Sequence, residues 1–397
     1  MKAKLGFNHT MRACNIAAFS QAIVCGFLPL LFVMFNRDYK IALYLVTLLT
    51  TLNFVMQLTM DFISLFFVDK VSYRVTIVAA HAFVAVGFLV LGLIVPRVES
   101  TYAALVVAVL LVSAGGGIFE VMVSPIVEAC PSDNKTAAMS ITHSMYGVGS
   151  VAVVVVTNIL LVLFGRENWH YIALFWALLP ILNGIYFLLV PINKVVENSE
   201  RIPMTKLIKR KSFLIFFLIM FCSGAAEVGM SQWASAFAES ALGISKTLGD
   251  ILGPCIFAGM LTISRIIYSK ISHRINAVKY LLCCSIMTVI FYGCAALVPF
   301  RFAAIIACGL CGFTAGVMWP ATLSLASAHY PTGGVAMFGL FALGGDIGCT
   351  MGPTLIGMAS SAVGGDLRVG LLMACIFPIL SVISMALLMK RMKKVKV

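Results

Sequence analysis

The sequence predicts an all-α membrane protein with twelve transmembrane helices in two pseudo-symmetric six-helix bundles. Three observations predict this fold class: the composition, the recurrence of long apolar runs, and a repeat between the two halves. Of the 397 residues, 61% are hydrophobic and 11% are charged, and the mean hydropathy is +1.04. Soluble domains carry about 25% charged residues. The composition therefore excludes a soluble enzyme, a nucleic-acid-binding domain and a disordered chain, and it disfavours an outer-membrane barrel.

Long apolar runs separated by short polar breaks recur along the whole chain. A helix needs about 20 apolar residues to cross a bilayer, and several runs are longer, which predicts tilt or kinks. We interpret each run as one transmembrane helix. In chain order the predicted spans are 11–35, 41–67, 75–96, 102–127, 138–164, 171–190, 213–237, 248–268, 280–298, 302–328, 335–362 and 369–389.

Basic residues set the predicted orientation in the membrane. Most of the 28 lysine and arginine residues fall in the breaks on the side of the N-terminus, where we also count Arg265, near the end of the eighth run. Positive residues favour the cytoplasmic side. We therefore expect a protein of the cell membrane with both termini in the cytoplasm. The same bias explains the net charge of +13 without a nucleic-acid partner.

The longest polar segment, 191–212, lies in the middle of the chain and is rich in basic residues. It separates six predicted helices from another six. We therefore expect an N-terminal bundle over 1–190, a cytoplasmic linker over 191–212, and a C-terminal bundle over 213–397. Within the linker, Met204 to Lys211 is the expected place of a short amphipathic helix.

The two halves repeat each other in sequence. The stretch Asp69-Lys70-Val-Ser-Tyr-Arg74 follows the second run, and Ser269-Lys270-Ile-Ser-His-Arg274 follows the eighth, so a K-x-S-x-R pattern returns after 200 residues. The fourth and tenth runs each carry a proline, Pro125 and Pro320, at a similar place. Such similarity predicts two related bundles facing each other across an axis along the membrane normal.

Twelve helices, a central linker and this repeated basic loop resemble the major facilitator superfamily over the whole chain. Within it, Gly117-Ile-Phe-Glu120-Val-Met-Val-Ser-Pro125 resembles the fourth helix of the fucose:proton symporter family. The seventh run, Gly224-Ala-Ala-Glu227-Val-Gly-Met-Ser-Gln-Trp233, is similar to relatives in that family as well. The resemblance implies secondary transport. The sequence departs from the family in the first helix, where Cys25 or Gly26 stands near the place of the family's aspartate.

Four acidic residues lie well inside apolar runs, and charged groups there are costly and usually functional. No lysine or arginine lies equally deep in our interpretation. A lone carboxyl in a low dielectric favours its protonated form, which is the physical basis of proton coupling. We therefore expect the coupling protons on these residues, which are Asp61, Glu120, Glu227 and Asp346.

Glu120 is the strongest candidate among these acids. It follows three consecutive glycines, which allow close helix packing, and precedes Pro125, which frees a backbone carbonyl. His143 and Tyr146 lie three residues apart on one face of the fifth run, and we expect them near Glu120. The alternative is a protonated glutamate that serves only helix packing.

Polar side chains in four other runs are candidate substrate ligands. Asn53, Gln57 and Asp61 form one stripe on the second helix. This stripe either faces water or substrate, or forms hydrogen bonds to a neighbouring helix. A tryptophan beside carboxyl and amide groups suits sugars, because the ring stacks on C–H groups while the polar groups bond hydroxyls. The remaining candidates are Asn15, Gln21, Glu227, Gln232, Trp233 and Trp319, with core packing as the alternative for the aromatic ones.

The predicted function is a secondary active transporter for proton-coupled uptake of a small polar solute such as a monosaccharide, by alternating access. The alternatives are a proton-driven exporter of amphipathic compounds, a uniporter, and a non-transporting sensor. We expect small-molecule substrate, protons and the lipid bilayer as partners, a monomer, and no cofactor, metal or enzymatic activity. Charged residues at the helix ends are the expected inner gate, namely Asp69, Lys70, Arg74, Lys270 and Arg274.

Overall fold

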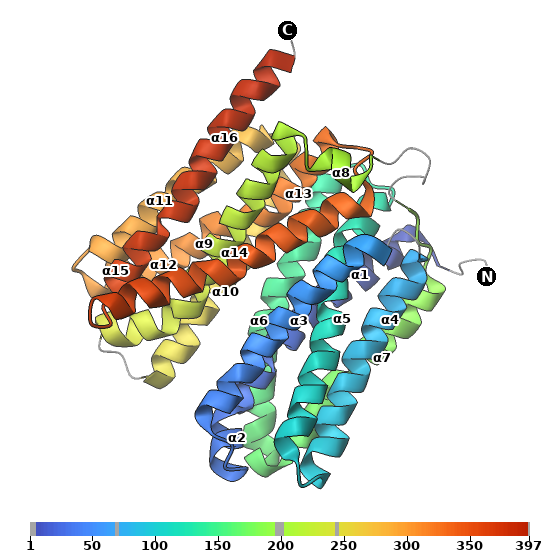
Figure 1. Cartoon of the computed structure of the whole chain (residues 1–397), viewed down its shortest axis with the longest axis vertical. Coiled ribbons are helices and arrows are strands. Elements are labelled where there is room, and N and C mark those ends of the chain that lie inside the picture. The colour runs from blue at the N-terminus through green and yellow to red at the C-terminus, as the bar shows by residue number, and fades with distance from the viewer. Residues whose placement is uncertain (1–4, 68–70, 195–201, 243–245, 396–397) are drawn as a thin grey trace. The chain divides into compact units, whose positions relative to one another are not determined.

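The computed structural model describes residues 5–67, 71–194, 202–242 and 246–395, and all regular elements within these ranges are helices (Figure 1). The predicted gate residues Asp69 and Lys70 lie outside the described residues. The helices are α1 (Phe7–Gly26), η1 (Leu28–Leu31), α2 (Phe32–Asp38), α3 (Leu43–Phe67), α4 (Tyr73–Leu89), η2 (Val90–Ile94), η3 (Val95–Arg97), α5 (Thr101–Ala129), α6 (Lys135–Phe164), η4 (Arg166–Asn168), α7 (Trp169–Leu189), α8 (Met204–Leu207), α9 (Lys211–Leu242), α10 (Lys246–Ile271), α11 (Ala277–Leu297), α12 (Arg301–Ala315), α13 (Met318–His329), α14 (Gly334–Ala362), α15 (Leu367–Ala374) and α16 (Ile376–Val395).

The predicted spans correspond to these helices. Among the described residues, 11 helical segments are long and apolar enough to cross a membrane, and each matches a predicted run. The remaining run, 248–268, lies within α10, a helix of 26 residues. The run 302–328 is divided into α12 and α13 at Gly316 and Val317, and the run 369–389 is divided at Cys375. The predicted all-α membrane fold is confirmed.

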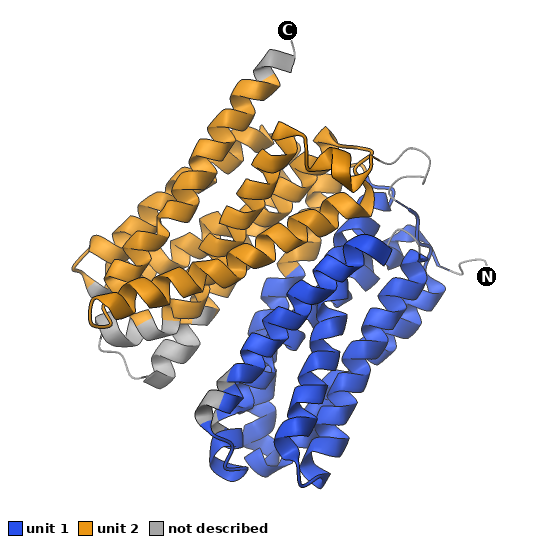
Figure 2. Cartoon of the chain, in the orientation of Figure 1, with its two compact units in different colours: residues 1–132, 145–198 blue, residues 133–144, 199–397 orange. Residues whose placement is uncertain are grey.

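The chain forms two compact units, shown in different colours in Figure 2. The first comprises residues 1–132 and 145–198, and the second comprises 133–144 and 199–397. The start of α6 therefore belongs to the second unit, while the rest of this helix belongs to the first. The expected division at 190 and 213 assigns the whole of α6 to the N-terminal bundle. The first residues of α6 group with the second unit through contacts between residues far apart in the sequence, and the order of residues along the chain does not show such contacts.

Three consecutive glycines in α5 organise the first unit. A Cβ on Gly115 would overlap the Ala80 carbonyl of α4, and one on Gly117 would lie 2.8 Å from the Gln57 carbonyl oxygen of α3. Gly116, between them, faces α1. Each glycine thus faces a different helix: Gly115 and Gly117 leave space for backbone atoms of α4 and α3, and Gly116 leaves space for side chains of α1.

The same close approach occurs in the second unit. Gly312 of α12 faces the carbonyl of Phe257 in α10, at a Cβ distance of 2.5 Å. Positions 57 and 257 are 200 residues apart, the interval at which the K-x-S-x-R pattern returns. The two carbonyls thus share the interval of the sequence repeat, whereas the two glycines, Gly117 and Gly312, are 195 residues apart.

The end of the predicted linker packs within the second unit. The helix α8 is shorter than expected, and its Leu207 is fully buried. The guanidinium of Arg210 lies 5.6 Å from the centre of the Tyr330 ring, and the Ile202 amide donates to the Thr332 carbonyl at 3.0 Å. Burial raises the pKa of the Tyr330 hydroxyl, which keeps the ring neutral beside the cation. These contacts anchor the described part of the linker to the segment between α13 and α14.

Candidate functional site

The first unit brings together three of the predicted site residues from three helices. The Gln21 side-chain amide of α1 donates to Gln57 Oε1 of α3 at 2.7 Å. The same nitrogen donates to Glu120 Oε2 of α5 at 3.4 Å. Gln21 and Gln57 are buried, and Glu120 is half-buried. The result is a polar cluster of two amides and one carboxylate inside an apolar bundle.

The α5 glycines explain why these three side chains meet. A Cβ at Gly116 would lie 2.9 Å from Gln21 Oε1, so the absent side chain leaves the space that the Gln21 amide occupies. Gly117 brings the backbone of Gln57 against α5, one turn before Glu120. The glycine run predicted as a packing device therefore also positions the polar cluster.

The rest of the predicted α3 stripe is buried in the same unit. Asn53 accepts a hydrogen bond from the Ser113 hydroxyl of α5, and Asp61 is fully buried. Cys25 of α1 lies 3.7 Å from Gln57 Nε2. Cys25, Asn53 and Ser113 also line a small cavity of about 30 Å³, most of whose other lining residues are apolar. The stripe thus faces the interior of the unit along its whole length.

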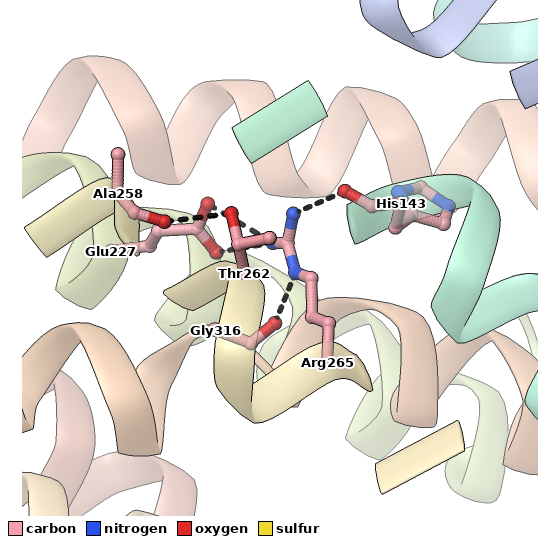
Figure 3. Close-up of polar contacts among 6 residues, drawn as sticks. All are labelled: His143, Glu227, Ala258, Thr262, Arg265 and Gly316. Atoms are coloured by element: carbon pink, nitrogen blue, oxygen red, sulfur yellow. Dashed lines mark hydrogen bonds and ion pairs between the residues drawn. The ribbon is translucent and has the colours of Figure 1, made fainter. Parts of the chain in front are cut away.

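The second unit contains a buried ion pair that the sequence interpretation missed. Arg265 of α10 is 3% exposed, and its Nη2 lies 3.1 and 3.0 Å from the two carboxylate oxygens of Glu227 in α9 (Figure 3). The expectation that no basic residue lies as deep as the four acids is therefore wrong for Glu227. The sequence interpretation counts Arg265 with the cytoplasmic breaks, although this residue falls inside the predicted run 248–268. That position was the signal available in the sequence.

The other two nitrogens of Arg265 bond backbone carbonyls. Nε donates to the Gly316 carbonyl at 2.6 Å, and Nη1 donates to the His143 carbonyl of α6 at 2.7 Å. Gly316 follows the last residue of α12, so its carbonyl is at the negative end of a helix dipole, where a cation is stabilised. The Ser140 hydroxyl of α6 in turn donates to the Arg265 carbonyl at 2.6 Å. Arg265 thereby connects α6, α9, α10 and the break between α12 and α13.

Gln232 and Trp233 lie further along α9 than Glu227 and do not join the ion pair. They line an open recess with α14, in which Trp233 Nε1 donates to the Pro353 carbonyl at 3.0 Å. Trp319 is buried, and its ring fills the space over Gly345 of α14, where a side chain would overlap it. Both aromatic candidates of this unit therefore pack against α14.

The remaining candidates are more widely spread. His143 belongs to the second unit, whereas Tyr146, three residues later on α6, belongs to the first. Asn15 on α1 and Asp346 on α14 are half-buried.

Two of the described gate residues, Lys270 and Arg274, are exposed at the end of α10. Arg74 is different, because its Nη1 donates to the carbonyls of Phe187 and Leu188 at 2.7 and 2.8 Å. It thus joins the start of α4 to the end of α7.

These arrangements differ in what they can do chemically. The Gln21–Gln57–Glu120 cluster offers amide donors and acceptors together with a carboxyl group that can bind or release a proton. The Glu227–Arg265 pair offers a carboxylate held by a permanent cation. In the described residues, no group of three or more His, Cys, Asp and Glu is arranged to hold a metal ion.

Comparisons with known proteins agree with this architecture. The family model of the Major Facilitator Superfamily matches residues 13–353. The solved structures with a similar fold include a single-residue variant of the E. coli fucose:proton symporter FucP, with a TM-score of 0.77 and 14% identity over 96% of this chain and 98% of that chain. They also include the proton:xylose symporter XylE bound to 6-bromo-6-deoxy-D-glucose, with a TM-score of 0.77 and 10% identity over 96% of this chain and 95% of that chain.

No curated protein shows significant sequence similarity to the chain. At identities of 14% and 10%, the structural neighbours show a shared fold and no more. The match over residues 13–353 covers most of the sequence, and the expected resemblance to the superfamily is confirmed. The chain belongs to the Major Facilitator Superfamily and is a multi-pass membrane transporter rather than an enzyme.

Proposed function

We propose that this transporter takes up a small polar solute, such as a monosaccharide, together with protons, by alternating access between its two bundles. The observation that carries the proposal is the cluster of Gln21, Gln57 and Glu120. Amide and carboxylate groups bond the hydroxyls of a sugar, and a carboxyl group in an apolar bundle can exchange a proton. The names of the structural neighbours, which are sugar:proton symporters, support the same substrate class.

In this proposal Glu120 carries the coupled proton and also contacts the substrate. It becomes protonated on the outer side, the substrate binds, the bundles reorient, and both are released inside. Asp61 and Asp346 remain further candidates for proton binding. Both termini lie in the cytoplasm, the protein resides in the cell membrane, and it acts as a monomer.

The experiment is substrate-triggered proton movement in proteoliposomes with a pH-sensitive dye inside. A panel of hexoses, deoxyhexoses, pentoses, amino sugars and polyols is added outside to wild type and to Glu120→Gln. We expect acidification with at least one sugar and its loss in the variant. Entry of a labelled sugar without acidification would establish uniport instead.

If no sugar in the panel caused acidification and no labelled sugar entered the liposomes, the sugar proposal would be overturned and export of amphipathic compounds would be favoured. Control liposomes without protein measure the passive proton leak. The Ser231→Ala variant is the matched control, because the Ser231 hydroxyl donates to the Val228 carbonyl of its own helix at 3.3 Å. It should acidify the lumen as wild type does.

A further inference from the structure

The geometry around Arg265 fixes the direction in which this cation points. Its Nε and Nη1 each donate to a backbone carbonyl, at Gly316 and His143, and backbone carbonyls cannot change their charge. Only Nη2 is directed at a carboxylate, Glu227 (Figure 3). Because a guanidinium stays protonated in proteins, Glu227 faces a permanent positive charge at 3.0 Å.

Glu227 is the accessible member of this pair. Its side chain is 13% exposed, against 3% for Arg265. A carboxylate has about four lone-pair positions, and Arg265 Nη2 uses one on each oxygen. The carboxylate therefore keeps acceptor positions for other donors on the side that Arg265 does not cover.

We propose that Arg265 is a positioning residue that holds Glu227 ionised through the transport cycle, so that Glu227 is a fixed acceptor for substrate hydroxyls and not a proton carrier. This inference rests on the proposed function. It also changes the expected role of Glu227, which the sequence interpretation had placed among the proton-coupling acids. The translocated proton then belongs to another acid, with Glu120 first.

Other titratable groups also lie near this part of α9. The hydroxyl of Tyr292 in α11 donates to the Ala226 carbonyl at 2.6 Å, and Cys349 of α14 faces Gly224. From α6, His143 meets Arg265 through its backbone carbonyl. Arg265 is the cation that bonds the Glu227 carboxylate.

The first test measures the ionisation of Glu227 without any substrate, by infrared difference spectroscopy of the purified protein at about pH 5 and about pH 8. Subtracting Glu227→Gln from wild type should give a carboxylate band at both pH values and no protonated-carboxyl band. Arg265→Lys should keep the carboxylate band, because an ammonium supplies the same charge. Arg265→Gln should convert it to a protonated-carboxyl band, because desolvation disfavours an uncompensated charge.

A protonated band for Glu227 in wild type would overturn the proposal, whatever the protein transports. Thr262→Val is the matched control on α10. The Thr262 hydroxyl donates to the Ala258 carbonyl of its own helix at 2.8 Å (Figure 3), so its loss should leave the Glu227 bands unchanged.

The second test measures exchange of labelled L-fucose and D-xylose across proteoliposomes at equal pH, which needs no net proton flux. Glu227→Gln should raise the KM for exchange about tenfold, the usual effect of losing a hydrogen bond to a charged group. Arg265→Lys should restore part of the affinity that Arg265→Gln loses. If Glu227→Gln exchanged normally and lost only proton-driven accumulation, Glu227 would be a proton carrier and the proposal would fail. If wild type moved neither sugar, the substrate assignment would fail while the infrared result still decided the role of Arg265.

Discussion

At the scale of single residues, the half-buried Glu120 and Glu227 each accept a hydrogen bond from a different kind of donor. Glu120 accepts a hydrogen bond from the neutral amide of Gln21, whereas Glu227 is bonded to the cation of Arg265. A guanidinium favours the charged form of the carboxylate that it bonds, whereas a neutral amide adds no charge. Two acids that look alike in the sequence are therefore suited to different tasks.

Removing one member of the buried ion pair should destabilise the second unit. We expect Arg265→Gln and Glu227→Gln each to cost about 3–5 kcal/mol, because each leaves its partner or the carbonyls it bonded without compensation. The double variant should lose less than the sum of the two single losses. Thermal unfolding in detergent, measured as a double-mutant cycle, tests this coupling. Additive losses would show that the two side chains act independently.

Within the first unit, Gln21→Leu should cost about 1–3 kcal/mol of stability. The reason is that Gln57 Oε1, which is buried, would lose the amide donor at 2.7 Å. Replacing both amides, in Gln21→Leu with Gln57→Leu, should recover part of this loss by removing the orphaned acceptor. The same unfolding measurement distinguishes an orphaned acceptor from a simple loss of packing. If only packing were lost, the second substitution would destabilise the protein further.

At the scale of elements, glycines on α5 and α12 set how closely helices cross. Gly117 approaches the carbonyl of residue 57, and Gly312 approaches that of residue 257. Arg74 and Arg265 both donate to carbonyls at helix C-terminal ends, on α7 and α12 respectively. Such bonds satisfy carbonyls that have no partner within their own helix. Helix ends and helix crossings, rather than loops, therefore organise each unit.

A methyl group should be tolerated at some glycines and not at others. Gly117→Ala should destabilise the first unit, because the new Cβ would lie 2.8 Å from the Gln57 carbonyl oxygen and 2.9 Å from Met60 Cβ. Gly293→Ala on α11 is the matched comparison, since a Cβ there meets nothing within 4 Å. It should stabilise the helix by about 0.5–1 kcal/mol. Equal effects on the melting temperature of both variants would contradict the contact.

At the scale of the whole molecule, the distribution of basic residues predicts the topology. We expect green fluorescent protein fused after Val397 to fluoresce and alkaline phosphatase fused there to be inactive, because both results mark a cytoplasmic end. Fusions truncated at Arg166, in a predicted outer break, should give the opposite pattern. Phosphatase activity at the C-terminus would mean that the orientation in the membrane is reversed. The proposed direction of transport would then be reversed as well.

The sequence by itself determined the membrane class, the helical spans and the superfamily, because each depends on hydropathy, chain length and local pattern. It also placed Gln21, Gln57 and Glu120 among the candidates, since a polar side chain in an apolar run is conspicuous wherever it points. Only the tertiary structure decided which candidates meet: amides and a carboxylate in the first unit, and Glu227 with Arg265 in the second. The physical reason is that an ion pair between α9 and α10 depends on helix rotation and crossing, which packing sets and hydropathy does not record. From hydropathy alone, Arg265 is expected near a membrane boundary. In the structure it is buried, because the carboxylate of Glu227 and two backbone carbonyls compensate its charge.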